Sequence, residues 1–336
     1  TWALLLAAGI AFWRCLPDPL FTQPVSSIAL GRDGQLLGAR IATDGQWRFP
    51  PLKAVPDKFA RAIVTFEDKR FYYHPGVDPL ALARSLRLNL RAGSVVSGAS
   101  TLSMQVIRLA RTQPRRTYGE KLIEAILALR LELRHSKAQI LALYAGNAPF
   151  GGNVVGLEAA AWRYFGRGPE KLSWAESCLL AVLPNSPALI HPVRTRAGLL
   201  RKRDGLLRQL HRRGVIGQLD LDLALREPLP DRPLPLPQHA PHLLETLLAA
   251  GGGRPHRFET GIDRALQIAV GDLVQGRAAL LARQDIHNAA ALVIDNHSFQ
   301  VLAYVGNADW SVNNEHGYAV DIIQRPRSTG SVLKPL

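Results

Sequence analysis

Residues 66–78 (FEDKRFYYHPGVD) hold the side chains best suited to chemistry in this sequence. Glu67 and Asp68 are adjacent acids, two bases follow them, and aromatic residues and His74 come next. A carboxylate in such a setting can take a proton from an attacking hydroxyl. The alternative is a charged helix end with solvated side chains, which would be the better interpretation of an isolated Glu-Asp pair. The flanking aromatics, His74 and Gly76 favour the chemical interpretation.

Two further stretches have the composition of a binding site. The sequence SGASTLSMQ (97–105) is a Gly/Ser/Thr loop that leads into a helix, and such a loop offers backbone N–H groups and hydroxyls to an anion. Within the helical pattern of residues 116–132, Lys121 and Glu124 are three residues apart and share one face. Each stretch alone is a weak signal.

Helices must position these residues. The apolar run 62–66 predicts the end of a helix, so Glu67 should lie where a rigid element stops and the chain turns open. Asp78 and Pro79 should be the cap and the first position of the next helix. Apolar residues at three- and four-residue spacing predict helices at residues 79–91, 101–111, 118–135, 137–145, 158–165 and 173–183.

The first residues point to a membrane. The run WALLLAAGIAFW (2–13) is uncharged and apolar, but it is shorter than the roughly twenty residues that span a bilayer. We interpret residues 1–16 as the second half of a transmembrane helix or signal-anchor, in preference to a buried core helix, because core helices are rarely so free of polar residues. Residues 17–52 predict a small β element, with a hairpin signal at residues 32–34.

The chain of 336 residues is strongly basic, with a formal charge of +14 and a pI near 10.3. This charge implies an anionic partner: nucleic acid, an acidic membrane or a phosphate-bearing substrate. An aromatic content of 7%, without an RNP-like or zinc-finger pattern, argues against nucleic acid. Many basic residues fall in residues 194–213, where a helix would lie close to anionic lipid headgroups, although most of its side chains would be solvated. Cys15 and Cys178 provide neither a disulfide framework nor metal-ligand spacing.

Composition divides the rest of the chain. Residues 53–226 form a helical domain, and residues 227–257 form a linker whose proline-rich part tends to polyproline II. Residues 258–336 predict a helix to about residue 284 and then a hairpin over residues 290–306, the opening of an α/β domain. The predicted fold is therefore mainly α with a small β element, followed by an incomplete α/β domain.

Taken in order, these stretches resemble the glycosyltransferase family 51 domain of class A penicillin-binding proteins. The family pattern EDxxFxxHxGxD is met by Glu67, Asp68, Phe71, His74, Gly76 and Asp78. The pattern G-x-S-T-x-x-x-Q is met by Gly98, Ser100, Thr101 and Gln105, and K-x-x-E is met by Lys121 and Glu124. One departure is Ser103-Met104, where many members have Thr-Gln. The resemblance covers nearly the whole chain and implies a lysozyme-like α fold against a membrane, followed by the start of a transpeptidase domain.

The resemblance implies polymerisation of lipid II into β-1,4-linked glycan strands, with inversion and release of undecaprenyl pyrophosphate. Glu67 would be the base that takes the proton from the acceptor hydroxyl, and the diphosphate leaving group would need no protonation. Lys121, Arg116 and Arg108 would supply positive charge to the diphosphate, together with any divalent cation (Mg²⁺ or Mn²⁺), which would be loosely held. We see no dedicated metal-ligand cluster and predict no firmly bound cofactor.

The other family positions receive supporting roles. Glu124 would hold a metal or orient a lysine, Asp68 would be a structural or electrostatic neighbour of the base, and Asn147 would fix a loop. The predicted substrate-binding residues are Asp68, Phe71, His74, Gly98, Ser100, Thr101, Gln105, Arg108, Arg116 and Asn147.

Ser331 and Lys334 form S-x-x-K, the acylation pattern of penicillin-binding proteins. Ser331 would be the nucleophile, and Lys334 would help to deprotonate it. The pattern is common by chance, but its place after the predicted hairpin gives it weight. The companion patterns S-x-N and K-T-G should follow it, and the sequence stops at Leu336. We therefore expect no transpeptidase activity and no penicillin binding from this chain.

Three interpretations compete. The favoured one is an inverting glycosyltransferase with a single-pass anchor in a bacterial inner membrane and periplasmic catalytic domains. Its partners would be lipid II, the growing strand, the membrane and proteins of cell-wall synthesis. A lytic muramidase with Glu67 as general acid ranks lower, because a hydrolase of a polymer needs neither a membrane helix nor the K-x-x-E pair. The third is a basic, anchored scaffold that binds wall precursors or proteins without turnover.

Overall fold

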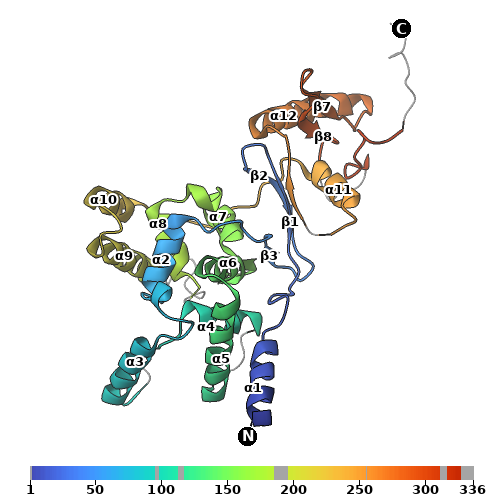
Figure 1. Cartoon of the computed structure of the whole chain (residues 1–336). Coiled ribbons are helices and arrows are strands. Elements are labelled where there is room, and N and C mark those ends of the chain that lie inside the picture. Colours follow the sequence, from blue (N-terminus) through green and yellow to red (C-terminus); the bar gives the residue numbers. More distant parts are fainter. Residues whose placement is uncertain are drawn as a thin grey trace. The chain divides into compact units, whose positions relative to one another are not determined.

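The computed structural model describes residues 2–94, 98–112, 117–184, 196–254, 256–310 and 316–326. Its contacts divide the chain into two compact units, residues 1–25 with 43–234 and residues 26–42 with 235–336. The described parts are mainly helical with small sheets, as predicted (Figure 1).

The first unit is a helical assembly with one short sheet. Its helices are α1 (Trp2–Arg14), α2 (Asp57–Glu67), α3 (Pro79–Ala92), α4 (Leu102–Ala110), α5 (Tyr118–Arg134), α6 (Lys137–Asn147), α7 (Leu157–Phe165), α8 (Trp174–Val182), α9 (Arg196–Arg212) and α10 (Gln218–Arg226). Strand β5 (Val154–Val155) pairs with both β3 (Trp47–Arg48) and β4 (Pro149–Gly151). Helix α2 packs on α8 and α9, and α4 packs on α5 and α6.

The helices that carry the predicted site begin at local capping signals. Asp78 accepts a hydrogen bond from the backbone N–H of Ala81 at the start of α3, and Pro79 is the first helical residue, as predicted. Thr101 caps α4, Thr117 caps α5 and Ser136 caps α6, each through its side-chain oxygen. Each cap contributes about 1 kcal/mol, so the sequence sets these starting points locally.

Helix α9 differs in one respect from the expectation of a solvated basic face. It buries Leu199, Leu206, Leu207 and Leu210, and Arg203 is also buried. The Arg203 guanidinium bonds to the Asp204 carboxylate and to the carbonyl oxygen of residue 227, which explains how its charge is tolerated in the interior.

The second unit contains the predicted hairpin. Strand β1 (Ser27–Leu30) pairs antiparallel with β2 (Leu36–Arg40) and parallel with β6 (Arg257–Glu259). Residues 26–42 thus group with the second unit, whereas the sequence pattern predicts a separate element between membrane and helical domain. Pairing between residues so far apart in the chain leaves no local sequence signal.

The second unit also contains two helices and a second hairpin. Helix α11 (Pro241–Ala250) lies in the stretch predicted as linker: a proline at the first helical position is compatible with a helix, and Leu243, Leu244 and Leu248 are buried. Helix α12 (Arg264–Leu281), the short 3₁₀ helix at 282–284 and the hairpin of β7 (Ala291–Ile294) and β8 (Val301–Val305) confirm the predicted helix and hairpin.

None of the helices that the structure describes has both the length and the apolar character needed to cross a bilayer. The interpretation of residues 1–16 as part of a membrane anchor therefore stays a prediction.

Candidate active site

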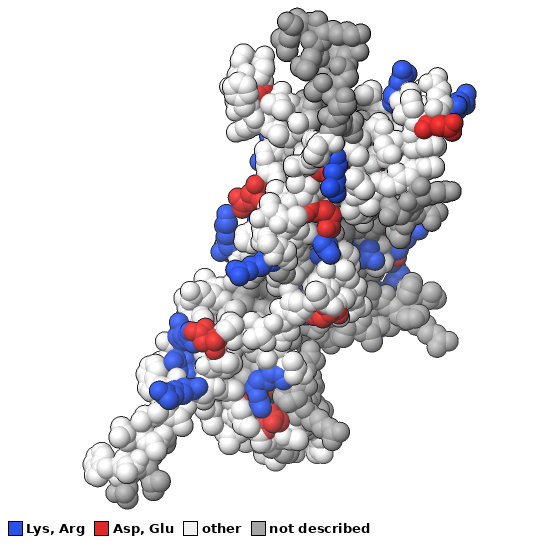
Figure 2. All heavy atoms as spheres, turned by 90° about the vertical axis from the view of Figure 1, so that its right-hand side faces the viewer, with Lys and Arg blue, Asp and Glu red and all other residues white. Residues whose placement is uncertain are grey.

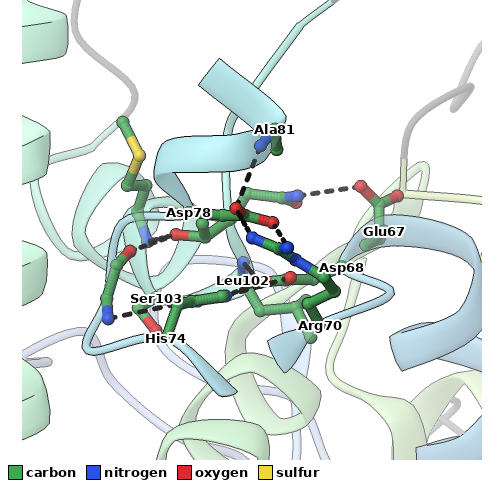
Figure 3. Close-up of polar contacts among 12 residues, drawn as sticks. Glu67, Asp68, Arg70, His74, Asp78, Ala81, Leu102 and Ser103 are labelled. Atoms are coloured by element: carbon green, nitrogen blue, oxygen red, sulfur yellow. Dashed lines mark hydrogen bonds and ion pairs between the residues drawn. The ribbon is translucent and has the colours of Figure 1, made fainter. Parts of the chain in front are cut away.

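Glu67 is the last residue of α2, where the helix stops and the chain turns, as predicted (Figure 3). The helix is held by its buried face, which includes Phe59 and Ile63. The Glu67 side chain is half-buried, and its Oε2 atom accepts a hydrogen bond of 2.8 Å from Nε2 of Gln105 on α4. The carboxylate is thus carried by a rigid element and oriented by a second one.

Asp68, in contrast, is buried and fully engaged (Figure 3). Its carboxylate accepts from the backbone N–H of Leu102 at 3.0 Å and lies 3.0 Å from Nε2 of His74. The N–H of Gly76 donates to Nδ1 of His74 at 3.1 Å, so Nδ1 carries no proton and Nε2 must carry it. His74 is therefore a neutral donor to Asp68, and the pair fixes the loop rather than performing chemistry.

Only a glycine fits at position 76, because of its backbone conformation and its closeness to α5. Its φ of +106° lies in the region that favours glycine, and a Cβ atom would come within 2.6 Å of the carbonyl oxygen of Ala128 on α5. The Thr101 hydroxyl donates to the Gly76 carbonyl oxygen. The loop is therefore pressed against α5 and tied to the start of α4.

Asp78 closes the loop by an ion pair with Arg70 (Figure 3). Burial opposes ionisation of the Asp78 carboxyl, but hydrogen bonds from the Arg70 guanidinium and from the Ala81 N–H outweigh it and lower its pKa. Asp78 thus combines a helix cap with an anchor for Arg70.

Glu67, Asp68, Arg70 and Asp78 border a cavity of about 340 Å³. Glu67 lines it together with Phe66, Asp68, Lys69, Arg70, Asp78, Leu80, Ala81, Arg84, Gly98, Ala99, Ser100 and Thr101. The predicted residues Gly98, Ser100 and Thr101 are thus brought to the same cavity as Glu67. Lys69, Arg70 and Arg84 were not predicted as site residues: the first two occupy variable positions of the family pattern, and Arg84 lies outside all of the family patterns.

The K-x-x-E pair is arranged differently from the expectation. Both oxygens of Glu124 accept from the Arg108 guanidinium, at 2.7 and 2.8 Å, and Glu124 is buried. Glu124 therefore orients an arginine rather than a lysine. Lys121 instead donates to the Ser100 hydroxyl at 3.1 Å, which places its ammonium beside the lining of the cavity. The hydrogen bonds that Arg108 donates to the Glu124 carboxylate raise the pKa of Arg108, so this cation keeps its charge.

Two further predicted residues have structural contacts, and three others lie outside the described residues. Phe71 is fully buried under the ammonium of Lys137, 4.5 Å from the ring centre, and so supports the loop. The Asn147 amide donates to the carbonyl oxygen of Leu143 within α6. The predicted residues that lie outside the described part of the chain are Arg116, Ser331 and Lys334.

Within the part of the chain that the structure describes, no group of three or more His, Cys, Asp or Glu side chains is placed to hold a metal ion. Two acids of the cavity are engaged by protein donors: Asp68 by Leu102 and His74, and Asp78 by Arg70. We therefore assign no metal ligands here.

Comparisons with known proteins bear on this site. A family model described as Transglycosylase matches residues 33–211. The chain is 34% identical to penicillin-binding protein 1C of Escherichia coli (strain K12), over 99% of this chain and 44% of that protein. It is 34% identical to penicillin-binding protein 1A of Aquifex aeolicus (strain VF5), over 67% of this chain and 31% of that protein. For penicillin-binding protein 1B of E. coli the identity is 30%, over 90% of this chain and 38% of that protein.

A solved structure, that of penicillin-binding protein 1A from Haemophilus influenzae, aligns with a TM-score of 0.34 and 16% identity, over 76% of this chain and 29% of that chain. The chain spans less than half the length of each of these relatives.

Proposed function

Because this chain belongs to the transglycosylase family, we propose that it is the peptidoglycan glycosyltransferase part of a class A penicillin-binding protein of the 1C type. The match to residues 33–211 includes residues 66–78 with Glu67 and Asp68, the Gly/Ser/Thr loop and the K-x-x-E pair. The 34% identity to penicillin-binding protein 1C extends over 99% of the chain, which supports the 1C type.

The reaction is the extension of a glycan strand by lipid II. The acceptor sugar hydroxyl attacks the anomeric carbon of the donor, and Glu67 takes the hydroxyl proton as the new C–O bond forms. The bond from the anomeric carbon to the diphosphate breaks, and undecaprenyl pyrophosphate leaves with the electron pair. Attack from the face opposite the leaving group inverts the anomeric centre. The observation that carries this proposal is the Glu67 carboxylate, which is held by Gln105 at the end of a rigid helix and lines the cavity.

The leaving diphosphate needs positive charge as its own negative charge develops. Lys69, Arg70 and Arg84 line the cavity, and the Lys121 ammonium lies within hydrogen-bond distance of the lining residue Ser100. The Gly/Ser/Thr loop adds Gly98, Ser100 and Thr101 to the lining, whereas the Leu102 N–H at the start of α4 already donates to Asp68. A loosely held divalent cation is compatible with this arrangement, but no step requires one.

Exposed apolar helix faces support a membrane location. On α3, Leu80, Leu82, Leu86, Leu88 and Leu90 are exposed, and on α5 so are Leu122, Ile123, Ile126, Leu129 and Leu133. Helix α1 exposes Trp2, Leu6, Ile10 and Trp13, and the Arg130 guanidinium of α5 lies 4.3 Å from the Trp13 ring centre. These three helices extend from the same side of the first unit (Figure 1). Apolar surface of this extent is typical of a membrane or protein contact, and an inner-membrane location with periplasmic catalysis fits it.

The charge on one face of the molecule argues against a nucleic-acid site on that face. On the face shown in Figure 2, Lys and Arg side chains are interspersed with Asp and Glu and form no continuous basic stripe among the described residues. A nucleic-acid site would need such a stripe along its length.

The decisive experiment is polymerisation of labelled lipid II in detergent by the parent chain and by Glu67→Gln. We expect glycan strands from the parent and a rate at least about 100-fold lower from Glu67→Gln, because the amide cannot accept the proton. Glu120→Gln is the matched control, since Glu120 pairs with Arg111 and does not line the cavity. Bound lipid II without strands from either protein would favour the scaffold, and shortening of preformed strands would favour the muramidase.

A further inference from the structure

Helix α3 carries a row of arginines along one side. Arg84, Arg87 and Arg91 are separated by three and four residues, so they lie one above another on the helix surface. All of them are exposed, and α3 contains no acidic residue that could balance their charge. At about 1.5 Å of rise per residue, the row extends roughly 10 Å along the helix axis. We call these residues the α3 arginine row.

The α3 arginine row differs from other arginines of the first unit, which carboxylates hold. Arg61 pairs with Asp57 four residues away in α2, and Arg108 pairs with Glu124. Among the residues that the structure describes, in contrast, none of the guanidinium groups of the α3 arginine row forms a hydrogen bond or an ion pair. Like charges three or four residues apart repel each other on a helix. An anion that binds to the row would relieve this repulsion.

An apolar face of α3 lies beside the row. Leu82, Leu86 and Leu90 follow one another at four-residue spacing, and all of them are exposed. Arg87 and Leu90 are three residues apart, so the row and the apolar face are neighbours on the helix. Ser85 is the one buried residue of α3. Exposed leucines next to a row of arginines are typical of a helix that lies in the surface of a membrane.

The row begins at the cavity that contains Glu67. Arg84 lines this cavity, whereas Arg87 and Arg91 do not. The exposed apolar faces of α1, α3 and α5 extend from the same side of the first unit (Figure 1). A bilayer that receives these faces brings its headgroup phosphates to the arginines beside them, because a long arginine side chain can place its charge at the headgroup level.

We propose that the α3 arginine row binds the phosphate groups of anionic phospholipids, while the leucines of α3 enter the apolar part of the same leaflet. A guanidinium suits this ligand, because its N–H groups bind phosphate oxygens in pairs. An anionic partner without an apolar part would match the charge but leave the leucines in water. The row thus holds the cavity at the level of the headgroups, where a lipid-borne diphosphate is presented. This inference goes beyond the proposed function and rests on the membrane location in it.

The test is co-sedimentation of the full chain with vesicles of phosphatidylcholine alone and with vesicles of phosphatidylcholine and phosphatidylglycerol in equal parts. The variant is Arg87→Gln with Arg91→Gln, which leaves Arg84 in the cavity and keeps a good helix former at both positions. An arginine near an anionic bilayer strengthens binding about fivefold, so the variant should lose about 10- to 30-fold in affinity for the mixed vesicles. Its affinity for phosphatidylcholine vesicles should change less than about twofold, because the leucines are intact.

The matched control is Arg208→Gln with Arg212→Gln on α9, which removes two exposed arginines at the same spacing. Leu206, Leu207 and Leu210 of α9 are buried, so they provide no apolar face for the bilayer. Charges held away from the membrane are screened by salt, and the control should weaken binding to the mixed vesicles less than about threefold. Equal losses on α3 and α9 would mean that net charge alone attracts the protein, and they would overturn the inference. A parent chain that does not prefer the mixed vesicles would overturn it as well.

Vesicle binding needs no turnover, so this inference and the proposed function fail separately. If Glu67→Gln kept the rate of strand synthesis while Arg87→Gln with Arg91→Gln lost the preference for the mixed vesicles, the α3 arginine row would stand and Glu67 would not be the base. If strand synthesis depended on Glu67 while the α3 variant bound the mixed vesicles like the parent, the row would be rejected and the glycosyltransferase would stand.

Discussion

Glu67 and Asp68 are neighbours in the sequence, but the fold gives them opposite surroundings. Asp68 is 5% exposed, and its oxygens receive the Leu102 N–H and the neutral His74 ring. Glu67 lies half-buried at the cavity, where the Gln105 amide donates to one of its oxygens. The oxygens of Asp68 are thus occupied by donors of the protein itself, which supports a structural role for Asp68 and agrees with the chemical role that we propose for Glu67.

At the same scale, Asp78 should make stability depend on pH. The pKa of Asp78 is lowered in the folded protein, whereas in an unfolded chain the pKa of an aspartate is about 4. The ionised carboxylate therefore contributes its full stabilisation above about pH 4, and this contribution is lost as the pH falls below that value. Asp78→Asn keeps a good helix cap but removes the charge that binds Arg70. We expect it to reduce the free energy of unfolding by about 1–2 kcal/mol at pH 7 and by progressively less below pH 4, measured by urea unfolding.

The control for this change is Asp57→Asn, which removes an exposed ion pair with Arg61. Such pairs contribute little, so the free energy of unfolding should change by less than about 1 kcal/mol at any pH. If Asp78→Asn reduced the free energy of unfolding by the same amount at pH 3 and at pH 7, the charge of Asp78 would not be the cause of the reduction.

At the scale of elements, a chain of polar contacts joins three helices to the site loop. The Ser103 hydroxyl of α4 reaches Glu132 of α5, and Lys137 of α6 donates to both Glu132 and the carbonyl oxygen of His74, at 2.7 Å each. Ser103 departs from the threonine that is common in the family, but it keeps the hydroxyl that this network uses. The departure is therefore compatible with an intact site.

The contact of the loop with α5 predicts a severe effect for Gly76→Ala. The new Cβ would meet the Ala128 backbone at 2.6 Å, where nothing flexible can move, and φ is +106°. We expect a loss of about 3 kcal/mol or more in the free energy of unfolding, together with loss of polymerase activity.

Gly93→Ala separates the two causes of that loss. Gly93, which ends α3, has a φ of +62°, and a Cβ there would meet nothing within 4 Å. It should cost about 1 kcal/mol from backbone conformation alone, without loss of activity. Equal losses at the two positions in thermal or urea unfolding would mean that the approach to α5 is unimportant.

At the scale of the whole molecule, the apolar faces of α3 and α5 predict binding to lipid. Leu82 and Leu90 on α3 are 51% and 74% exposed. Each leucine contributes about 1.5–3 kcal/mol when fully buried in an apolar phase, so Leu82→Glu with Leu90→Glu should weaken binding to anionic vesicles at least about tenfold. Co-sedimentation of the full chain with vesicles measures this.

Leu219→Glu is the matched change, because Leu219 on α10 is similarly exposed, at 72%. It should leave vesicle binding unchanged. If the changes on α3 and α10 weakened binding equally, the apolar face of α3 would not be the membrane contact.

Local features of the sequence determined the helices around the site and the types of residue in it, although they did not reveal α11. Asp78 with Pro79 predicts the start of α3, and apolar spacing predicts α4 to α8 within one or two residues, because helix periodicity and caps act over a few residues. The apolar run 62–66 likewise predicts that Glu67 lies at a helix end, and α2 does end at this residue.

Tertiary structure alone decided which of these residues meet. Gln105 reaches Glu67 across 38 residues, Glu124 turns to Arg108 rather than to a lysine, and β1 pairs with β6 from the far end of the chain. Such contacts depend on how helices and strands pack. They join residues that are far apart in the chain, and neither helix periodicity nor capping patterns reveal such pairs.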